Sequence, residues 1–115
     1  RKTSPNQDAY QYFGNPSPKK IDRKEIEERT MLMLLNEAVW CLEDNILQNP
    51  KDGDIGGVFG VGFLPWSGGP FSYMNLLGLD HVVNRMEYYA SIHGPKFNPR
   101  PLLKSMVDKA EKFIV

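Results

Sequence analysis

Two adjacent polar residues, Asn36 and Glu37, interrupt a segment that is otherwise strongly apolar. A carboxylate in such a setting could act as a general base, or it could anchor a substrate amide or hydroxyl group. The alternative is structural: a buried glutamate accepts hydrogen bonds from backbone N–H groups of a glycine-rich turn and so fixes its helix to that turn. We favour the structural interpretation, because no histidine stands at a fixed spacing from Glu37.

The other reactive side chains are isolated from one another. His81 and His93 lie near opposite ends of one expected helix, which is too far apart to bind the same metal ion. Cys41 is the only cysteine, and no neighbouring base or cation would activate its thiol. We therefore predict no metal site, surface or helix-end positions for the histidines, and a packed position for Cys41.

Seven of the ten glycines fall in one segment, DGDIGGVFGVGFLPWSGGPF, from Asp52 to Phe71. The segment lacks both G-x-G-x-x-G after a strand and a Gly-Lys-Ser/Thr ending, so we do not expect a nucleotide-binding loop. Glycine instead permits close approach of two backbones, and proline fixes turns. We predict a structural brace made by these residues: Gly60, Gly62, Pro65, Gly68, Gly69, Pro70 and Phe71.

The elements that would position these residues are helices. A long helix is expected from Asp22, which with Glu25 fits a capping box, to about Gln48. Short helices are expected over 54–62 and 71–77, followed by longer ones over 79–93 and 102–110. The fold class is thus all-α, a compact bundle of four to five helices around one long central helix. Residues 22–115 form this domain, and residues 1–21 form an extended linker or tail in which Tyr10 and Tyr12 alternate like a short strand.

Composition excludes several classes of function. Fourteen basic residues balance fourteen acidic ones, so no global field favours nucleic acid, and a membrane surface is an unfavoured partner. The longest apolar run, Met31 to Leu35, is too short to span a bilayer. The long helix is nevertheless apolar on nearly all sides, which predicts an exposed apolar patch on so small a domain.

Three segments together resemble a known family: NEAVWCLEDNIL, the glycine-rich segment, and LLGLDHVVNRMEYYASIHGPKFNPRPLL. They are similar, from about Glu25 to Phe113, to the C-terminal helical domain of 3-hydroxyacyl-CoA dehydrogenases. The likeness is to the second copy of that domain in multifunctional fatty acid oxidation α-subunits. The resemblance implies a 6-phosphogluconate dehydrogenase C-terminal-like fold. The opening RKT and YQY are similar to the strand that ends the preceding domain in the family, so the chain is expected to be a fragment.

The resemblance also implies that this copy is silent in catalysis. Hydride transfer in the family uses a His–Glu pair and a Rossmann domain that precede this region, and neither is matched here. Glu28 stands where the first copy has a substrate-contacting asparagine. We therefore expect no catalytic, cofactor-binding or metal-binding residue in this chain, although the intact protein would use NAD.

The partners implied are the preceding dehydrogenase domains of the same chain, and a second copy of the fragment in a homodimer. The alternative is a docking module for a thiolase subunit or a membrane surface, with Trp66, Phe71 and the Lys and Arg residues of the last third of the chain as anchors. The expected location is the cytoplasm for a bacterial protein, which we favour, and the mitochondrial matrix for a eukaryotic one.

Overall fold

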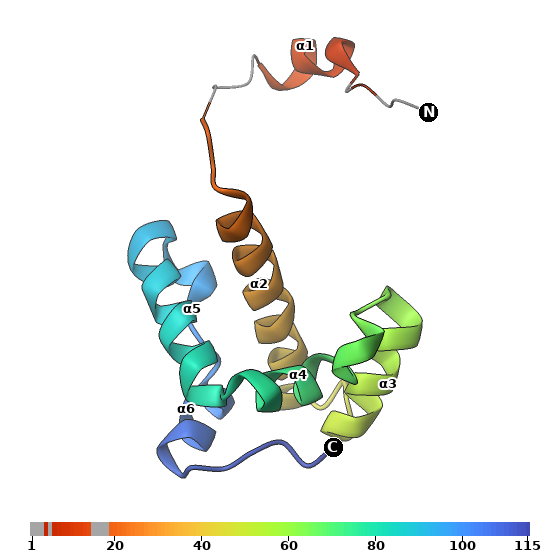
Figure 1. Ribbon diagram of the computed structural model, residues 1–115, viewed down its shortest axis with the longest axis vertical. Helices are drawn as coiled ribbons and strands as arrows, with labels where there is room; N and C mark the ends of the chain where they lie inside the picture. Colours follow the sequence, from red (N-terminus) through yellow and green to blue (C-terminus); the bar gives the residue numbers. More distant parts are fainter. Residues whose placement is uncertain (1–3, 5, 15–18) are drawn as a thin grey trace.

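Helices make up all the regular structure that is described. The computed structural model describes residues 4, 6–14 and 19–115. In order, its elements are η1 (Gln7–Ala9), α1 (Tyr10–Phe13), α2 (Arg23–Glu43), α3 (Pro50–Val61), η2 (Pro65–Ser67), α4 (Pro70–Leu77), α5 (Leu79–His93), η3 (Pro95–Phe97) and α6 (Pro101–Asp108). Helix α2 lies between α5 and α3, and α4 crosses near its C-terminal end (Figure 1). The all-α prediction is confirmed. The short α1 forms where a strand-like pair of tyrosines was predicted.

Prolines and glycines set most helix boundaries. Pro50, Pro70 and Pro101 each occupy the first turn of a helix, where the missing N–H costs nothing. Gly62, in the left-handed conformation with φ 74°, closes α3. Gly78 lies between α4 and α5. The predicted ends of these helices at glycines are therefore confirmed.

One predicted helix start and one predicted capping contact are wrong. Helix α3 begins at Pro50 rather than Asp54, since the Asn49 side chain accepts a hydrogen bond from the Asp52 N–H at 2.9 Å and caps it. Asp22 precedes α2 but makes no side-chain cap. The Glu25 carboxylate lies 3.4 Å from Arg29 Nη1 and from His93 Nε2 instead of reaching back to Asp22.

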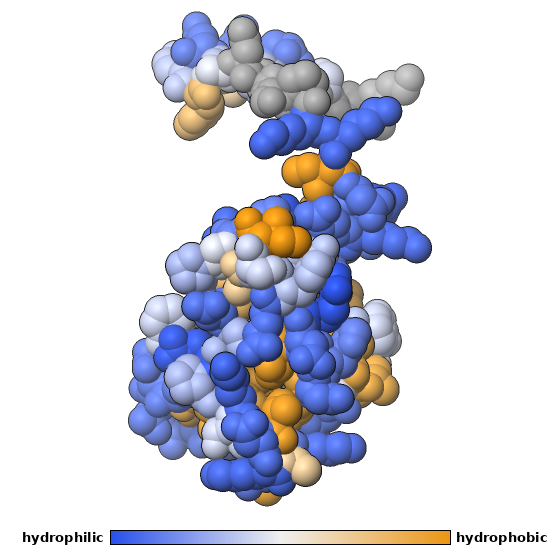
Figure 2. Space-filling view, turned by 90° about the vertical axis from the view of Figure 1, so that its left-hand side faces the viewer, coloured by the Kyte–Doolittle hydropathy of each residue, from blue (hydrophilic) through white to orange (hydrophobic). Residues whose placement is uncertain are grey.

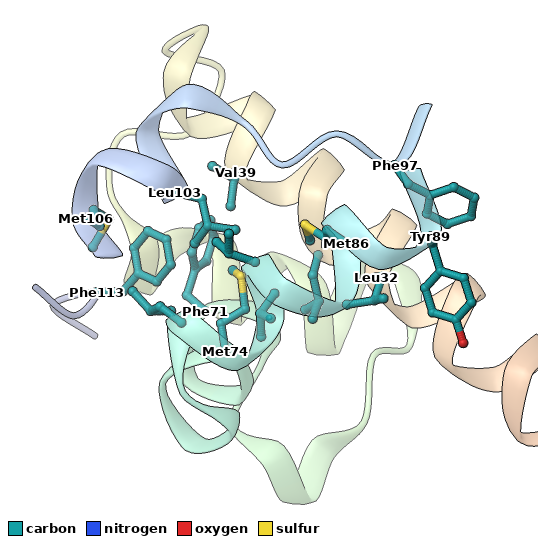
Figure 3. Packing of buried hydrophobic residues seen from close by; sticks show 14 of the residues in the cluster. Leu32, Val39, Phe71, Met74, Met86, Tyr89, Phe97, Leu103, Met106 and Phe113 are labelled. Atoms are coloured by element: carbon teal, nitrogen blue, oxygen red, sulfur yellow. The ribbon is translucent and has the colours of Figure 1, made fainter. Parts of the chain in front are cut away.

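The core runs along the inner face of α2 and has an aromatic cluster at each end. Figure 3 shows Phe71, Phe113 and Met106 at one end and Tyr89 with Phe97 at the other. The ring centroids are 4.9 Å apart for Phe71 and Phe113, and 5.6 Å apart for Tyr89 and Phe97. The fully buried side chains between and within these clusters are Leu35, Val39, Phe71, Met74, Val82, Met86 and Leu103. Each contributes roughly 1.5–3 kcal/mol of burial free energy.

Helix α2 presents a second apolar surface that the core does not use. We call it the outer face of α2; it comprises Ile26, Thr30, Met33, Leu34, Glu37 and Trp40. Its large apolar side chains are 38–48% exposed. Figure 2, which looks onto the side of the molecule that carries α5, shows a mostly hydrophilic surface with hydrophobic side chains in the gaps. No helix among the described residues has the length and hydrophobicity needed to cross a membrane.

Candidate functional site

The glycine-rich segment is organised around one buried carboxylate, Asp54. Asp54 lies in α3 and is 5% exposed. Its Oδ1 accepts a hydrogen bond from the Phe71 N–H at 2.7 Å, and its Oδ2 accepts from the Ser72 N–H at 3.1 Å and from the Ser72 Oγ at 2.6 Å. These donors belong to the first turn of α4, where free N–H groups and the helix dipole favour a negative charge. Asp54 therefore caps α4 from a different helix.

Glycines let the two segments approach closely enough for this contact. Gly69 stands at the N-cap position of α4 with φ 123°. A Cβ atom added there would lie 2.5 Å from the Asp54 Cα, and one added at Gly57 would lie 2.7 Å from the Pro70 Cδ. A Cβ on Gly53 would overlap the Phe71 ring. Close backbone approach is thus the role of the glycines at these crossings.

Among the other predicted brace residues, some are required by the local backbone conformation and one is not. Gly62 and Gly68 hold left-handed conformations, with φ of 74° and 83°, and Pro65 opens η2. Gly60 is exposed, and an added Cβ would meet nothing within 4 Å. Phe71 is fully buried, so its predicted alternative role as a docking anchor is wrong.

The predicted pair Asn36 and Glu37 separates into one buried and one exposed side chain. The Asn36 Nδ2 donates to the Asn98 backbone oxygen at 2.8 Å, and its Oδ1 accepts from the Arg100 N–H at 3.0 Å. Asn36 thus fixes α2 to the segment between η3 and α6, not to the glycine-rich turn. Glu37 is exposed on the outer face of α2, so its predicted burial is wrong. The carboxylate bound by the turn is Asp54.

Sequence reasoning missed a polar cluster between α2 and α5. Arg85 donates from Nε and Nη2 to the two carboxylate oxygens of Glu28, at 2.6 and 2.8 Å. The Tyr89 hydroxyl, on a side chain that is otherwise buried, donates to Glu28 Oε2 at 2.6 Å. The available signal was the spacing of Arg85 and Tyr89, which places both on one side of α5.

The cluster shifts the titration of its members. The hydrogen bond from Arg85 holds the pKa of Glu28 below its usual value, with the Tyr89 hydroxyl adding to the effect. Burial is the main cause of the raised pKa of Tyr89, followed by the hydrogen bond to Glu28. Glu28 in turn raises the pKa of Arg85. Glu28 is therefore an ionised partner in a bidentate pair and is poorly suited to act as a proton acceptor.

A cleft of ≈ 490 Å³ lies beside this cluster. It is lined by Lys24, Glu27, Glu28, Met31, Leu32, Leu35, Leu64, Tyr73, Leu77, His81, Val82 and Arg85. The lining residues from the N-terminal end of α2 are charged, and most of the others are apolar. The glycine-rich segment contributes to it only through Leu64, in the turn before η2.

The two histidines, His81 and His93, lie in different parts of the structure. His81 lines the cleft, whereas His93, at the other end of α5, has its Nε2 3.4 Å from Glu25 Oε1. Among the described residues, no group of three or more His, Cys, Asp or Glu side chains is arranged to hold a metal ion. The carboxylates of Asp54 and Glu28 each accept hydrogen bonds from another helix, so their role is to hold helices together.

Comparison with known proteins identifies the family. The sequence profile described as "3-hydroxyacyl-CoA dehydrogenase, C-terminal domain" matches residues 26–112. The fatty acid oxidation complex subunit alpha of Shewanella sp. (strain ANA-3) is 41% identical over 113 residues, which cover 98% of this chain and 16% of that protein. The proteins of the same name from Idiomarina loihiensis and Shewanella amazonensis are 46% and 49% identical over 89 residues, covering 77% of this chain and 13% of each relative.

The chain thus spans less than a fifth of the length of these relatives. The profile covers α2 through α6 and the start of the C-terminal tail, which are the elements that form the core and the glycine-rich brace. On this evidence the chain belongs to the 3-hydroxyacyl-CoA dehydrogenase C-terminal domain family.

Proposed function

We propose that the chain is a non-catalytic helical module of a fatty acid β-oxidation α-subunit. In the intact protein, other domains oxidise 3-hydroxyacyl-CoA to 3-ketoacyl-CoA with NAD. This module packs against the neighbouring helical domain of the same polypeptide and supports its active site. Because the compared relatives are bacterial, the proposal places the intact protein in the bacterial cytoplasm.

The observation that carries the proposal is the outer face of α2. Ile26, Met33 and Trp40 recur there at intervals of seven, as on one side of a helix that packs against another helix. A domain of this size has no further core to cover them. A neighbouring domain in the same polypeptide is held at high effective concentration, so a modest apolar face suffices for stable packing.

A point variant of the full-length subunit tests the packing. Met33→Glu should lower the unfolding temperature of the dehydrogenase region by several degrees, because it places a charge in the buried contact. At dilutions where the 115-residue chain is monomeric, the same variant should leave its unfolding temperature almost unchanged, since Met33 is partly exposed there. Phe59→Glu is the matched control: Phe59 is 87% exposed on α3. Equal effects of the two variants on the full-length subunit would contradict the proposal.

Deletion of residues 22–115 from the full-length subunit tests the supporting role directly. We expect lower stability and lower dehydrogenase turnover, because the neighbouring domain would expose the apolar surface that the module covers. Unchanged stability, assembly and turnover would remove the proposed function.

Exposure of Trp66 favours a second candidate function, docking of a thiolase subunit. Trp66 is 70% exposed and packs edge-on against Tyr73, with ring centroids 5.7 Å apart, so it presents a large and rigid apolar side chain. Capture of the thiolase subunit by the full-length protein should then fall in Trp66→Ala. Equal recovery from the wild-type protein and the variant would exclude this candidate.

A further inference from the structure

The segment that follows α6 is attached to the domain through one side chain. Lys109 and Ala110 form a turn, and residues 111–115 run away from α6 without regular structure (Figure 1). We call residues 111–115 the tail segment. Every residue of the turn and the tail segment is exposed except Phe113, which is 5% exposed. Phe113 is therefore the anchor of the tail segment.

The anchor is held at both its backbone and its ring. The Asn75 Nδ2, on α4, donates to the Phe113 backbone oxygen at 2.8 Å, and the Asn75 Oδ1 accepts from the Phe113 N–H at 3.0 Å. One side-chain amide thus pairs with both polar groups of one residue, as the opposite residue of an antiparallel strand pair does. The Phe113 ring meets the Phe71 ring edge-on, with centroids 4.9 Å apart (Figure 3). Asn75 and Phe71 together form a socket for one aromatic residue.

Between α6 and the anchor, the chain borders a hollow instead of packing against the domain. A hollow of ≈ 240 Å³ is lined by residues 110–112 and by residues of α4 and α5 that include Asn75. The charged side chains of this stretch add no attachment: among the described residues, Lys109, Glu111 and Lys112 take part in no ion pair. The socket therefore supplies most of the binding of the tail segment.

The turn that ends α6 carries conformational strain. Ala110 has a φ of 53°, a left-handed conformation that is unfavourable for residues other than glycine. Its N–H donates to the Val107 oxygen at 3.0 Å, and the Glu111 N–H donates to the Met106 oxygen at 2.9 Å. This is the helix-ending pattern in which glycine usually takes the left-handed position. Strain in the turn opposes attachment of the tail segment and so favours its release.

A single anchor sets how strongly the tail segment is held. Burial of one phenylalanine ring favours the bound form by roughly 10–150-fold, and each of the two hydrogen bonds adds a few-fold. Fixing the backbone of the tail segment reduces this product, which leaves a ratio of bound to released forms on the order of 10². Ratios of folded to unfolded forms of about 10³–10⁸ are typical of small domains. Release of the tail segment is thus less costly than unfolding.

We propose that the socket of Asn75 and Phe71 is a recognition site for an extended peptide segment that carries a phenylalanine. The tail segment occupies this site reversibly while the rest of the domain stays folded. The groups recognised are one backbone N–H, one backbone carbonyl and one aromatic ring, so a peptide with the same groups competes with Phe113. The site adjoins the glycine-rich brace, because Asp54 holds the Phe71 N–H. It goes beyond the proposed packing function, since it does not use the outer face of α2.

Amide hydrogen exchange of the ¹⁵N-labelled 115-residue chain measures the release. The Phe113 N–H should exchange about 10²-fold more slowly than an unstructured amide. Its rate should not change up to about 1 M urea, because release exposes little surface. The Leu35 N–H, in the middle of α2, should be more strongly protected and should exchange faster as urea is added. A Phe113 amide whose rate follows that of Leu35 across the urea series would overturn the proposal.

Variants separate release of the tail segment from unfolding of the domain. Leu32→Val, at the opposite end of the core from Phe113 (Figure 3), should speed exchange at Leu35 several-fold and leave the Phe113 amide unchanged. Asn75→Asp removes the donor to the Phe113 oxygen and should speed exchange of the Phe113 amide about tenfold. Asn84→Asp, the same change on the exposed side of α5, should not. Equal effects of the two aspartate variants on the Phe113 amide would overturn the role of Asn75.

A peptide added in trans tests the socket itself. The probe is an acetylated peptide of residues 111–115, and the control peptide has alanine in place of the phenylalanine. In Phe113→Ala, with folding checked by circular dichroism, the probe should give saturable shifts at the amides of Phe71 and Asn75, and the control peptide should bind at least about tenfold more weakly. The wild-type chain should bind the probe about 10²-fold more weakly than the variant, because its own Phe113 competes. Equal affinity of the two peptides or of the two proteins, or no binding at millimolar concentration, would overturn the proposal.

Discussion

At the level of single residues, the position of Asp54 explains why the glycine-rich segment folds as it does. Helix α4 begins with Gly69 and Pro70, neither of which offers a side-chain acceptor to the first turn. The carboxylate of Asp54 supplies that acceptor from α3. Because Gly69 lacks a Cβ atom, the backbone of Asp54 can come close enough to do so. One acid and one glycine thus join two helices that are separate in the sequence.

Removing the Asp54 carboxylate should destabilise the fold strongly. Asp54→Ala leaves the buried Phe71 N–H without an acceptor, and hydrogen bonds to a charged group are worth about 1.5–3 kcal/mol each. We expect the free energy of unfolding in urea to fall by about 3 kcal/mol. Asp52→Ala is the control, an exposed acid in the first turn of α3, and it should cost less than about 1 kcal/mol. Similar losses for both variants would refute the capping role.

Two glycine-to-alanine substitutions should change the stability of the fold in opposite directions. Gly69→Ala places a methyl group against the Asp54 backbone at a φ of 123° and should cost about 3 kcal/mol or more. Gly56→Ala fills open space inside the exposed part of α3 and should stabilise the protein by about 0.5–1 kcal/mol. Thermal unfolding of the two variants measures both effects. A loss of stability in Gly56→Ala would mean that the glycines of α3 are needed for more than close approach.

At the level of elements, local signals placed most of the helices but not their tertiary contacts. Pro70, Gly78 and Gly94 mark boundaries that depend only on backbone chemistry, and these were predicted correctly. Asn49-Pro50 was expected to stop the long helix at about Gln48, but α2 already ends at Glu43, and the same two residues cap and open α3. A proline ends one helix and begins the next equally well, so such a boundary cannot be assigned from the sequence alone.

The candidate site was harder to predict, because its contacts join residues far apart in the chain. Asn36 was identified as a polar anchor, yet its partners at 98 and 100 lie more than sixty positions away. Its neighbour Glu37 was assigned the contact that Asp54 makes. The helical periodicity of α2 limits which side faces the core, but both faces of α2 are apolar. Only the packed structure decides that Asn36 turns inward and Glu37 outward.

The contact between α2 and α5 should depend on pH through Glu28. Its pKa is lowered from the ordinary value of 4.5 in the folded chain, so its stabilising effect is present above pH 4.5 and is lost as pH falls through the lowered pKa. Urea unfolding at pH 7 and at pH 3 measures this effect. Between the two pH values, the free energy of unfolding should fall less in Glu28→Gln than in the wild type. Glu111→Gln, exposed and without a comparable contact, is the control. An identical pH dependence in wild type and Glu28→Gln would contradict the assigned pairing.

At the level of the whole molecule, α2 has two apolar faces: one packs into the core and the other is the exposed outer face. Its inner face carries Leu35 and Val39 into the core, and its outer face leaves Met33 and Trp40 half exposed. A small domain cannot enclose a helix on all sides, so the outer face is available for contact with another domain. Trp40 is partly covered by the Arg100 guanidinium, whose carbon lies 4.5 Å from the ring centroid. The rim of the face is therefore polar, as at many protein interfaces.

Without its neighbouring domain, the chain should associate with a second copy through this face. Two copies related by a two-fold axis near Met33 would pair antiparallel, which brings Arg29 of each copy towards Glu37 of the other and Ile26 towards Trp40. Sedimentation equilibrium should show a dimer that dissociates on dilution, and Met33→Glu should be monomeric at the same concentration. Phe59→Glu should dimerise as the wild type does, since Phe59 lies on α3. A wild-type chain that stays monomeric at millimolar concentration, or a dimer that survives Met33→Glu, would show that the outer face of α2 is not an interface.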